Sequence, residues 1–258
     1  MAPSTLALAA ACALVTGLTL GVIGGGGSVL TVPVFVYLLG YPAKEAIAMS
    51  LPVIGATSLI GAIGHWRRGN VQLRTALAFG AVAMAGSFAG ARLSQLVDGR
   101  FQLALLGLMM GGAALSMLRS ASTTAASDEP APQRPLALIA AAGIAVGILT
   151  GLVGVGGGFL IVPALVLLGG VPMKQAIGTS LAVITMNTLA GFAGYAGQVH
   201  IDWMAMGLFA GVAIAGILVG TRLVAHVSVV QLKRGFAFFL LAVAAFVLFQ
   251  SRAILLGR

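Results

Sequence analysis

The chain has 258 residues, of which 60% are hydrophobic and only 7% are charged. A soluble domain is about 25% charged, so the composition excludes an ordinary soluble protein and indicates one that crosses a membrane several times. The formal net charge of +9 does not indicate a nucleic-acid partner, because lysine and arginine lie in short segments between apolar runs. There they orient a membrane protein and contact anionic lipid headgroups.

About eight hydrophobic segments are predicted in chain order. A hydrocarbon core of about 30 Å needs about 20 apolar helical residues to cross it. The N-terminus lacks the basic stretch of a cleaved signal peptide, so we count it as part of the first segment. The expected fold class is an all-α polytopic membrane protein. The segments are 6–40, 46–65, 73–95, 101–119, 136–170, 176–196, 203–222 and 235–251, of which 6–40 and 136–170 are interrupted by glycines.

The chain repeats itself at an offset of 130 residues. The stretch GVIGGGGSVLTVPVFVYLLGYPAKEAIAMSLPVI, from Gly21, aligns with GLVGVGGGFLIVPALVLLGGVPMKQAIGTSLAVI, from Gly151, and GSFAGARL matches GILVGTRL. Glycines, prolines and a lysine coincide, which apolar composition alone does not produce. The repeat predicts two homologous halves, 6–119 and 136–251, joined by a polar linker over 120–135. Together they form one transmembrane transporter domain, 1–258.

Each half carries a glycine run inside an apolar segment, GGGGS at 24–28 and GVGGGF at 154–159. Irregular backbone is tolerated in hydrocarbon only against protein or a water-filled cavity, so the runs predict two discontinuous helices. Such pairs locate the central site of many secondary transporters, and we expect the two runs to meet and line one cavity. Close helix packing is the alternative, and it is the preferred interpretation for GSFAG and GILVG.

The ionisable residues favour an anion as ligand. The half-helix after each run would direct free N–H groups and a positive dipole end at the break. No carboxylate lies inside a plain span, where cation-coupled carriers commonly keep one. The histidines are scattered, so no metal and no cofactor are expected. The five acids, all in predicted loops, are Glu45, Asp98, Asp128, Glu129 and Asp202.

The candidate site residues lie in or just after the two runs. Lys44 and Lys174 are equivalent in the repeat, and snorkelling to the interface is the alternative for both. His65 and Tyr195 are also equivalent, and His65 is a candidate for a coupling proton. The candidate substrate-binding residues are Gly25, Gly26, Gly27, Ser28, Lys44, Ser50, Thr57, Gly156, Gly157, Gly158, Phe159, Lys174, Thr179, Ser180 and Asn187.

Two arrangements of the halves stay open. If each broken segment crosses the membrane, the halves run parallel and lysine and arginine divide seven to seven. If each broken segment dips in and returns, the halves are inverted and the division is nine to five. The positive-inside rule mildly favours the second arrangement.

The motifs GVIGGGGSVLTVP, GLVGVGGGFLIVPAL and AIGTSLAVI resemble the duplicated signature of the sulfite exporter TauE/SafE family, over roughly residues 10–250. The resemblance implies a multi-pass carrier of the bacterial inner membrane that moves sulfite, sulfonates or related organosulfur anions, often outward. In the first half Met49 and Pro52 replace Thr179 and Ala182 of the second, so equal participation of the halves is in doubt. An anion channel, an importer of another small anion and a non-transporting membrane subunit stay open, as does a homodimer.

Overall fold

The computed structural model describes residues 3–25, 27–123, 136–154, 157–167, 170–195, 197–223, 234–235, 237–238 and 241–249. Within these ranges the chain is helical, with no strand. The described part of the last expected segment, 235–251, is helical as well. The elements are α1 (Pro3–Ile23), α2 (Ser28–Pro33), the π-helical turn η1 (Val34–Leu38), α3 (Ala43–Trp66), α4 (Leu73–Leu93), the 3₁₀ turn η2 (Ser94–Leu96), α5 (Gly99–Thr123), α6 (Leu136–Val153), α7 (Gly158–Leu167), α8 (Met173–Tyr195) and α9 (Trp203–Leu223).

Five of these helices are long and apolar enough to cross a membrane. They are Thr5–Ile23, Ala43–Trp66, Leu73–Leu96, Lys174–Tyr195 and Trp203–Leu223. An α-helix rises 1.5 Å per residue, so each of them approaches or exceeds the hydrocarbon thickness of about 30 Å. The expectation of an all-α, multi-pass membrane protein is therefore confirmed.

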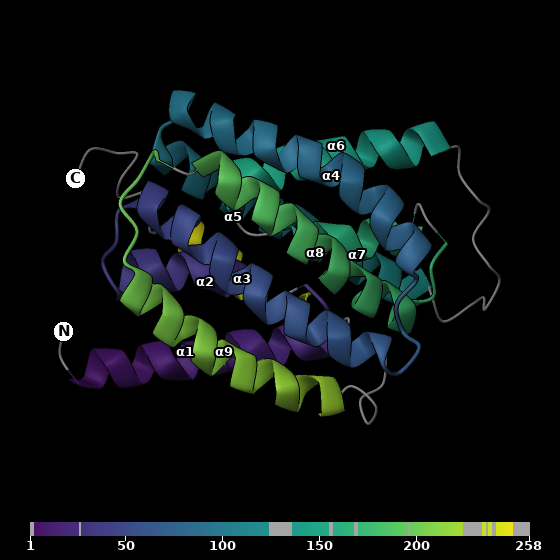
Figure 1. Ribbon diagram of the computed structural model, residues 1–258, viewed down its shortest axis with the longest axis horizontal. Coiled ribbons are helices and arrows are strands. Elements are labelled where there is room, and N and C mark those ends of the chain that lie inside the picture. Colours follow the sequence, from purple (N-terminus) through teal and green to yellow (C-terminus); the bar gives the residue numbers. More distant parts are fainter. Residues whose placement is uncertain are drawn as a thin grey trace.

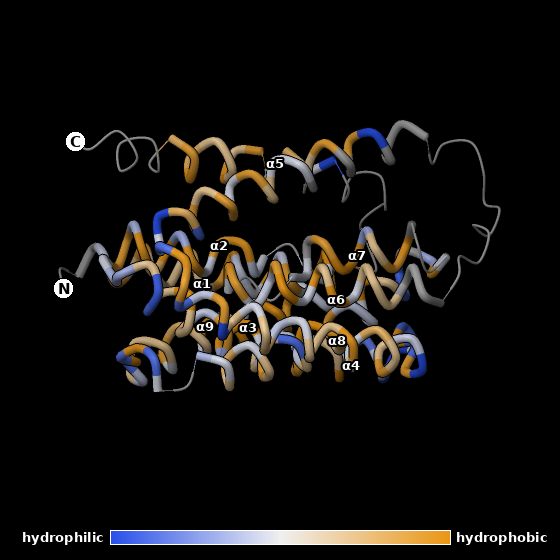
Figure 2. The backbone as a smooth tube through the Cα atoms, turned by 90° about the horizontal axis from the view of Figure 1, so that it is seen from above, coloured by the Kyte–Doolittle hydropathy of each residue, from blue (hydrophilic) through white to orange (hydrophobic). Residues whose placement is uncertain are grey.

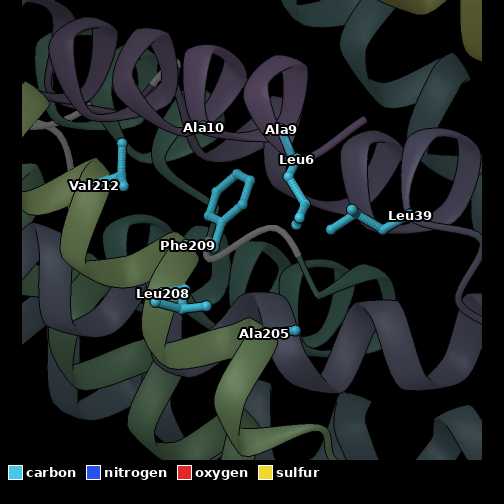
Figure 3. Close-up of a pocket in the computed structure, with 8 residues that line it drawn as sticks. All are labelled: Leu6, Ala9, Ala10, Leu39, Ala205, Leu208, Phe209 and Val212. Atoms are coloured by element: carbon cyan, nitrogen blue, oxygen red, sulfur yellow. The ribbon is translucent and has the colours of Figure 1, made fainter. Parts of the chain in front are cut away.

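The first glycine run turns the chain back on itself. Gly24 has a φ of 82°, a left-handed conformation that glycine adopts without steric cost, and its N–H donates to the carbonyl of Leu20 at 2.8 Å. A Cβ atom added at Gly27 would lie 2.1 Å from the carbonyl oxygen of Thr16. The returning chain ends beside the start of α1, because Leu39 and Leu6 line the same cavity (Figure 3). Thus α1 and α2 form a hairpin.

The second run forms a matching hairpin from α6 and α7. Gly154 has a φ of 74°, and its N–H donates to the carbonyl of Thr150 at 2.8 Å. A Cβ atom at Gly157 would lie 2.4 Å from Cγ2 of the same threonine, seven residues earlier. Both broken segments therefore return towards the side from which they enter.

Each hairpin packs against a helix from the other half of the chain (Figure 1). Along α1 and α9, a Cβ at Gly17 would meet the carbonyl oxygen of Ala213 at 1.8 Å, and one at Gly216 would meet that of Leu14 at 2.3 Å. Along α6 and α4, a Cβ at Gly86 would lie 2.5 Å from the carbonyl oxygen of Ile144. The expected close-packing role of GSFAG and GILVG is confirmed, because only glycine permits this backbone approach.

The helices that the 130-residue offset makes equivalent run in opposite directions. In the central pair, α3 and α8, a Cβ at Gly61 would meet Leu181, and one at Gly191 would meet Leu51. The residue numbers of these contacts rise along one helix as they fall along the other, so the two helices are antiparallel. Of the two arrangements left open by the sequence, the structure has the one in which each broken segment returns.

The bundle has two ends, which we name by a loop residue at each. At the Tyr41 end, the Tyr41 hydroxyl donates to Oδ2 of Asp202 at 2.6 Å, which joins the loops before α3 and α9. At the Arg68 end, Arg68 donates from Nη1 to the carbonyl oxygen of Thr221, which joins the ends of α3 and α9. Figure 2 shows the half-helices α2 and α7 in a layer between α5 and the layer of α3, α4, α8 and α9.

Candidate functional site

The two glycine runs touch in the interior. A Cβ atom at Gly25 would lie 2.2 Å from the carbonyl carbon of Gly158, and one at Gly158 would lie 2.3 Å from the Cα of Gly25. Both glycines are buried. The expected meeting of the two breaks is therefore confirmed, and the cavity that they were expected to line stays a prediction. Gly26, Gly156 and the side chain of Phe159 lie outside the described residues.

Two equivalent serines bind the two breaks crosswise. Ser50 of α3 places its Oγ 2.7 Å from the carbonyl oxygen of Ile47 and 2.5 Å from that of Gly154. Ser180 of α8 lies 2.8 Å from the carbonyl of Ile177 and 3.0 Å from that of Gly24. The carbonyls that end a helix have no partner within it, so each serine caps the break of the other half.

The hydroxyl of Ser28, the third at the breaks, also binds a backbone carbonyl of the protein. Ser28 donates from Oγ to the carbonyl oxygen of Gly25 at 2.7 Å and is fully buried. A hydroxyl has a single proton to donate. In this conformation Ser28, Ser50 and Ser180 therefore bind backbone carbonyls at or next to the breaks. The first N–H groups of α2 and α7, which have no acceptor within their own helices, are the candidate donors to a ligand.

Asn187 belongs to a polar cluster beside the second break. Thr150 donates from Oγ1 to the carbonyl of Gly147 at 3.0 Å and accepts from Nδ2 of Asn187 at 2.7 Å. Ser87 donates to the backbone carbonyl of Asn187 at 2.9 Å. Asn187 is 1% exposed and its Oδ1 has no hydrogen-bond partner among the described residues.

The equivalent cluster of the first half is almost entirely apolar. Thr150, Asn187 and Ser87 correspond to Leu20, Thr57 and Ile217, and Thr57 donates only within its own helix, to the carbonyl of Val53 at 2.7 Å. Sequence reasoning missed Thr150 and Ser87. The available signal was a polar residue in an apolar span whose repeat equivalent is apolar.

Three of the expected site residues lie beside the contacts to the breaks. Ile177 and Ile47 contact Gly24 and Gly154, and Lys174 and Lys44 precede them by three residues. Thr179 accepts the N–H of Gln72 at 2.9 Å, and Gln72 precedes α4. Lys44 begins α3 at the Tyr41 end and Lys174 begins α8 at the Arg68 end. The structure therefore places the two lysines at opposite ends of the bundle.

His65 and Tyr195 occupy matching places at the tips of the two hairpins. His65 donates from Nε2 to the carbonyl oxygen of Gly21, near the end of α1, at 3.2 Å. The Tyr195 hydroxyl donates to the carbonyl oxygen of Leu152, near the end of α6, at 3.1 Å. Both side chains are 1% exposed. Each ring therefore fastens the tip of one hairpin to a helix of the central pair.

The loops at the Tyr41 end hold a perturbed acid. Oδ1 of Asp202 accepts the N–H groups of Ala205 and Met204, at 2.9 and 3.1 Å, as an N-cap of α9. The hydrogen bond from the N–H of Ala205 is the largest cause that lowers the pKa of Asp202, and the bond from Tyr41 is the next. Burial is the largest cause that raises the pKa of Tyr41, to about 12, and the hydrogen bond to Asp202 is the next. The pair fixes α9 relative to the loop that leaves the first hairpin.

A cavity of about 260 Å³ near the Tyr41 end does not fit an anion. Figure 3 shows its lining, which is apolar throughout and comes from the starts of α1 and α9 and the residue after η1. It offers no side-chain donor. Among the described residues no group of three or more histidine, cysteine, aspartate or glutamate side chains is placed to hold a metal ion. The glycine breaks are therefore the candidate site. The lining residues are Leu6, Ala9, Ala10, Leu39, Ala205, Leu208, Phe209 and Val212.

Comparisons with known proteins indicate that the chain is a membrane transporter. The sequence profile described as "Sulfite exporter TauE/SafE" matches residues 9–247. A Xylella fastidiosa (strain 9a5c) protein named "Probable membrane transporter protein" is 35% identical over 246 residues, 93% of this chain and 94% of that protein. "Probable membrane transporter protein YdhB" of Bacillus subtilis (strain 168) is 29% identical over 218 residues, 82% and 84% of the two chains. No solved structure gives a significant match. The chain belongs to the sulfite exporter TauE/SafE family of membrane transporters.

Proposed function

We propose that this protein is a secondary transporter that exports small sulfur-containing anions, such as sulfite or sulfonates, across the bacterial inner membrane. The contact between Gly25 and Gly158 supports the proposal most strongly. It brings the starts of two half-helices to one buried point, and helix N-termini favour negative charge. The described carboxylates, Glu45, Asp98 and Asp202, lie at the Tyr41 end of the bundle, and none of them belongs to the breaks themselves.

The two halves, 6–119 and 136–251, act in this proposal as inverted repeats. Support comes from the antiparallel direction of equivalent helices and from the crossed bonds of Ser50 and Ser180. In such repeats, exchanging the conformations of the halves turns an inward-facing site into an outward-facing one. The Arg68 end is the cytoplasmic end, by the positive-inside rule. Described basic residues at this end include Arg67, Arg68, Arg74, Lys174 and Arg222, and those at the other end include Lys44, Arg92 and Arg100.

The serines give the transport cycle a physical switch. In the present conformation Ser50 and Ser180 donate to backbone carbonyls of the breaks. When the halves separate on one side, one of these bonds opens and its hydroxyl turns to the anion, where a hydrogen bond to a charged acceptor is worth about 1.5–3 kcal/mol. Asn187, Thr57 and Thr179 flank this path, and Lys44 and Lys174 attract the anion to the two mouths.

Flux through purified protein in liposomes tests the proposal. Vesicles loaded with sulfite, methanesulfonate, sulfate or chloride report which anion leaves, with empty vesicles as the blank. We expect saturable efflux of sulfite or methanesulfonate that accelerates when the same anion is present outside, as a carrier requires. Efflux that does not saturate and is indifferent to outside anion would indicate a channel. No flux of any of the four anions would refute the proposal.

A further inference from the structure

His65 is a buried imidazole with one nitrogen in use and one free. Its Nε2 donates to the carbonyl oxygen of Gly21, so in the neutral ring Nδ1 carries the lone pair. That Nδ1 is buried and has no hydrogen-bond partner among the described residues, and the side chain is 1% exposed. A buried polar atom without a partner is costly. Here it is the one position on the ring that can take a proton.

The structural role of this ring does not require a group that titrates near neutral pH. The equivalent residue, Tyr195, makes the corresponding bond to Leu152 with a hydroxyl. Gln102 stands beside it, with Nε2 2.8 Å from the same carbonyl oxygen. One half of the protein therefore fastens its hairpin with tyrosine, and the other half does so with the one side chain whose charge changes between about pH 5 and 8.

The groups around His65 are cationic or neutral. Arg68 follows in the same segment and binds the carbonyl of Thr221 on α9, beside Arg222. A Cβ at Gly178 of α8 would lie 2.9 Å from the Cβ of His65, one turn after Lys174. From α1 the carbonyl of Gly21 faces the ring. The described carboxylates all lie at the opposite end of the bundle.

A proton on Nδ1 thus adds positive charge where no described carboxylate balances it. The first break is close by, because Gly21 and Gly24 lie one turn apart at the end of α1. An anion held at that break would supply the missing negative charge. Anion and proton would then favour each other's binding, and such a coupling is reciprocal by thermodynamic necessity.

We propose that His65 is a proton-binding site, and that a proton on its Nδ1 and an anion at the first break bind together and cross together. The proton is taken from solution on one side and released with the anion on the other. The inference rests on the proposed transport function, which it deepens by naming the coupled ion.

The test uses methanesulfonate, which stays fully ionised near neutral pH and so carries no proton of its own. Proteoliposomes with a pH-sensitive dye inside receive an inward methanesulfonate gradient. The variants are His65→Tyr, which copies the residue at position 195, and Tyr195→Phe as the matched control. We expect wild type and Tyr195→Phe to acidify the lumen as methanesulfonate enters. We expect their entry rate to fall about tenfold or more from pH 6 to pH 8, because each unit of pH above the pKa of a base lowers its protonated fraction about tenfold.

The His65→Tyr variant should still move methanesulfonate, without acidification and at a rate that does not depend on pH. Acidification and pH dependence that persist in this variant would overturn the inference, as would methanesulfonate entry without protons in wild type. If the His65→Tyr variant does not fold, the His65→Gln variant is used in its place, because glutamine keeps a donor for the carbonyl of Gly21. Proton uptake on adding methanesulfonate to the detergent-solubilised protein gives a second readout, expected for wild type and absent from the variant. Absence of methanesulfonate and sulfite flux in wild type would instead refute the proposed function.

Discussion

The contact between the two breaks should make Gly25 intolerant of even one methyl group. The Cβ of an alanine at this position would lie 2.2 Å from the carbonyl carbon of Gly158 and 2.3 Å from its oxygen. Carbon atoms pack best at about 3.5 Å or more, so the two breaks must separate by about 1.3 Å. Both neighbours are backbone atoms, which no rotamer change relieves. Overpacking of this kind costs about 1–3 kcal/mol.

We therefore expect Gly25→Ala to melt at a lower temperature and to raise the apparent constant for sulfite about tenfold or more, since ~1.4 kcal/mol is a factor of ten. Gly207→Ala is the matched control, because nothing lies within 4 Å of its added Cβ and it sits within α9. Thermal unfolding and sulfite saturation curves at equal expression compare the two. If Gly25→Ala matches Gly207→Ala in both measurements, the breaks do not form a shared site.

Three further predictions concern the surroundings of the breaks. Asn187→Ala should raise the apparent sulfite constant more than Thr57→Ala, because only Asn187 belongs to a polar cluster; the opposite order in saturation curves would assign the polar side to the other half. Lys174→Met should raise the same constant at low salt and much less at high salt, because exposed charges are screened; a change that salt does not affect would refute steering. Tyr41→Phe removes one of the bonds that lower the pKa of Asp202. The stability from this carboxylate is present above its unfolded pKa of about 3.9 and is lost as pH falls through its lowered folded pKa. The variant should therefore lose this stability at a higher pH than wild type. A ¹³C NMR titration in which the pKa of Asp202 does not rise in the variant would contradict this.

The positions of the breaks could be predicted from the sequence, and the path of the chain beyond them could not. Gly24 and Gly154 end α1 and α6 as expected, because a glycine run costs helix stability. A left-handed glycine ends a helix whether the chain then continues or returns. The return is fixed by tertiary contacts such as that of Gly27 with Thr16, which no local pattern records.

The role of a side chain could be predicted from the sequence where the residue stands next to a break. The prediction failed where the hydrogen-bond partner comes from a distant part of the chain. Ser50 and Ser180 were expected at the site and do bind the breaks, but they bind those of the opposite half. Thr179 was expected beside them, and its hydroxyl instead accepts from the loop residue Gln72. The exchange of partners between the halves decides both cases, and it depends on the packing of α3 against α8.

The most direct test of the central claim is to locate the anion. Selenite is the selenium analogue of sulfite, and its anomalous scattering marks its position in crystals of the protein grown at a concentration that saturates flux. The account predicts an anomalous peak between the starts of α2 and α7, within hydrogen-bond distance of backbone N–H groups next to Gly25 and Gly158. Peaks only at exposed lysines and arginines of the two ends, with none at the breaks, would contradict it.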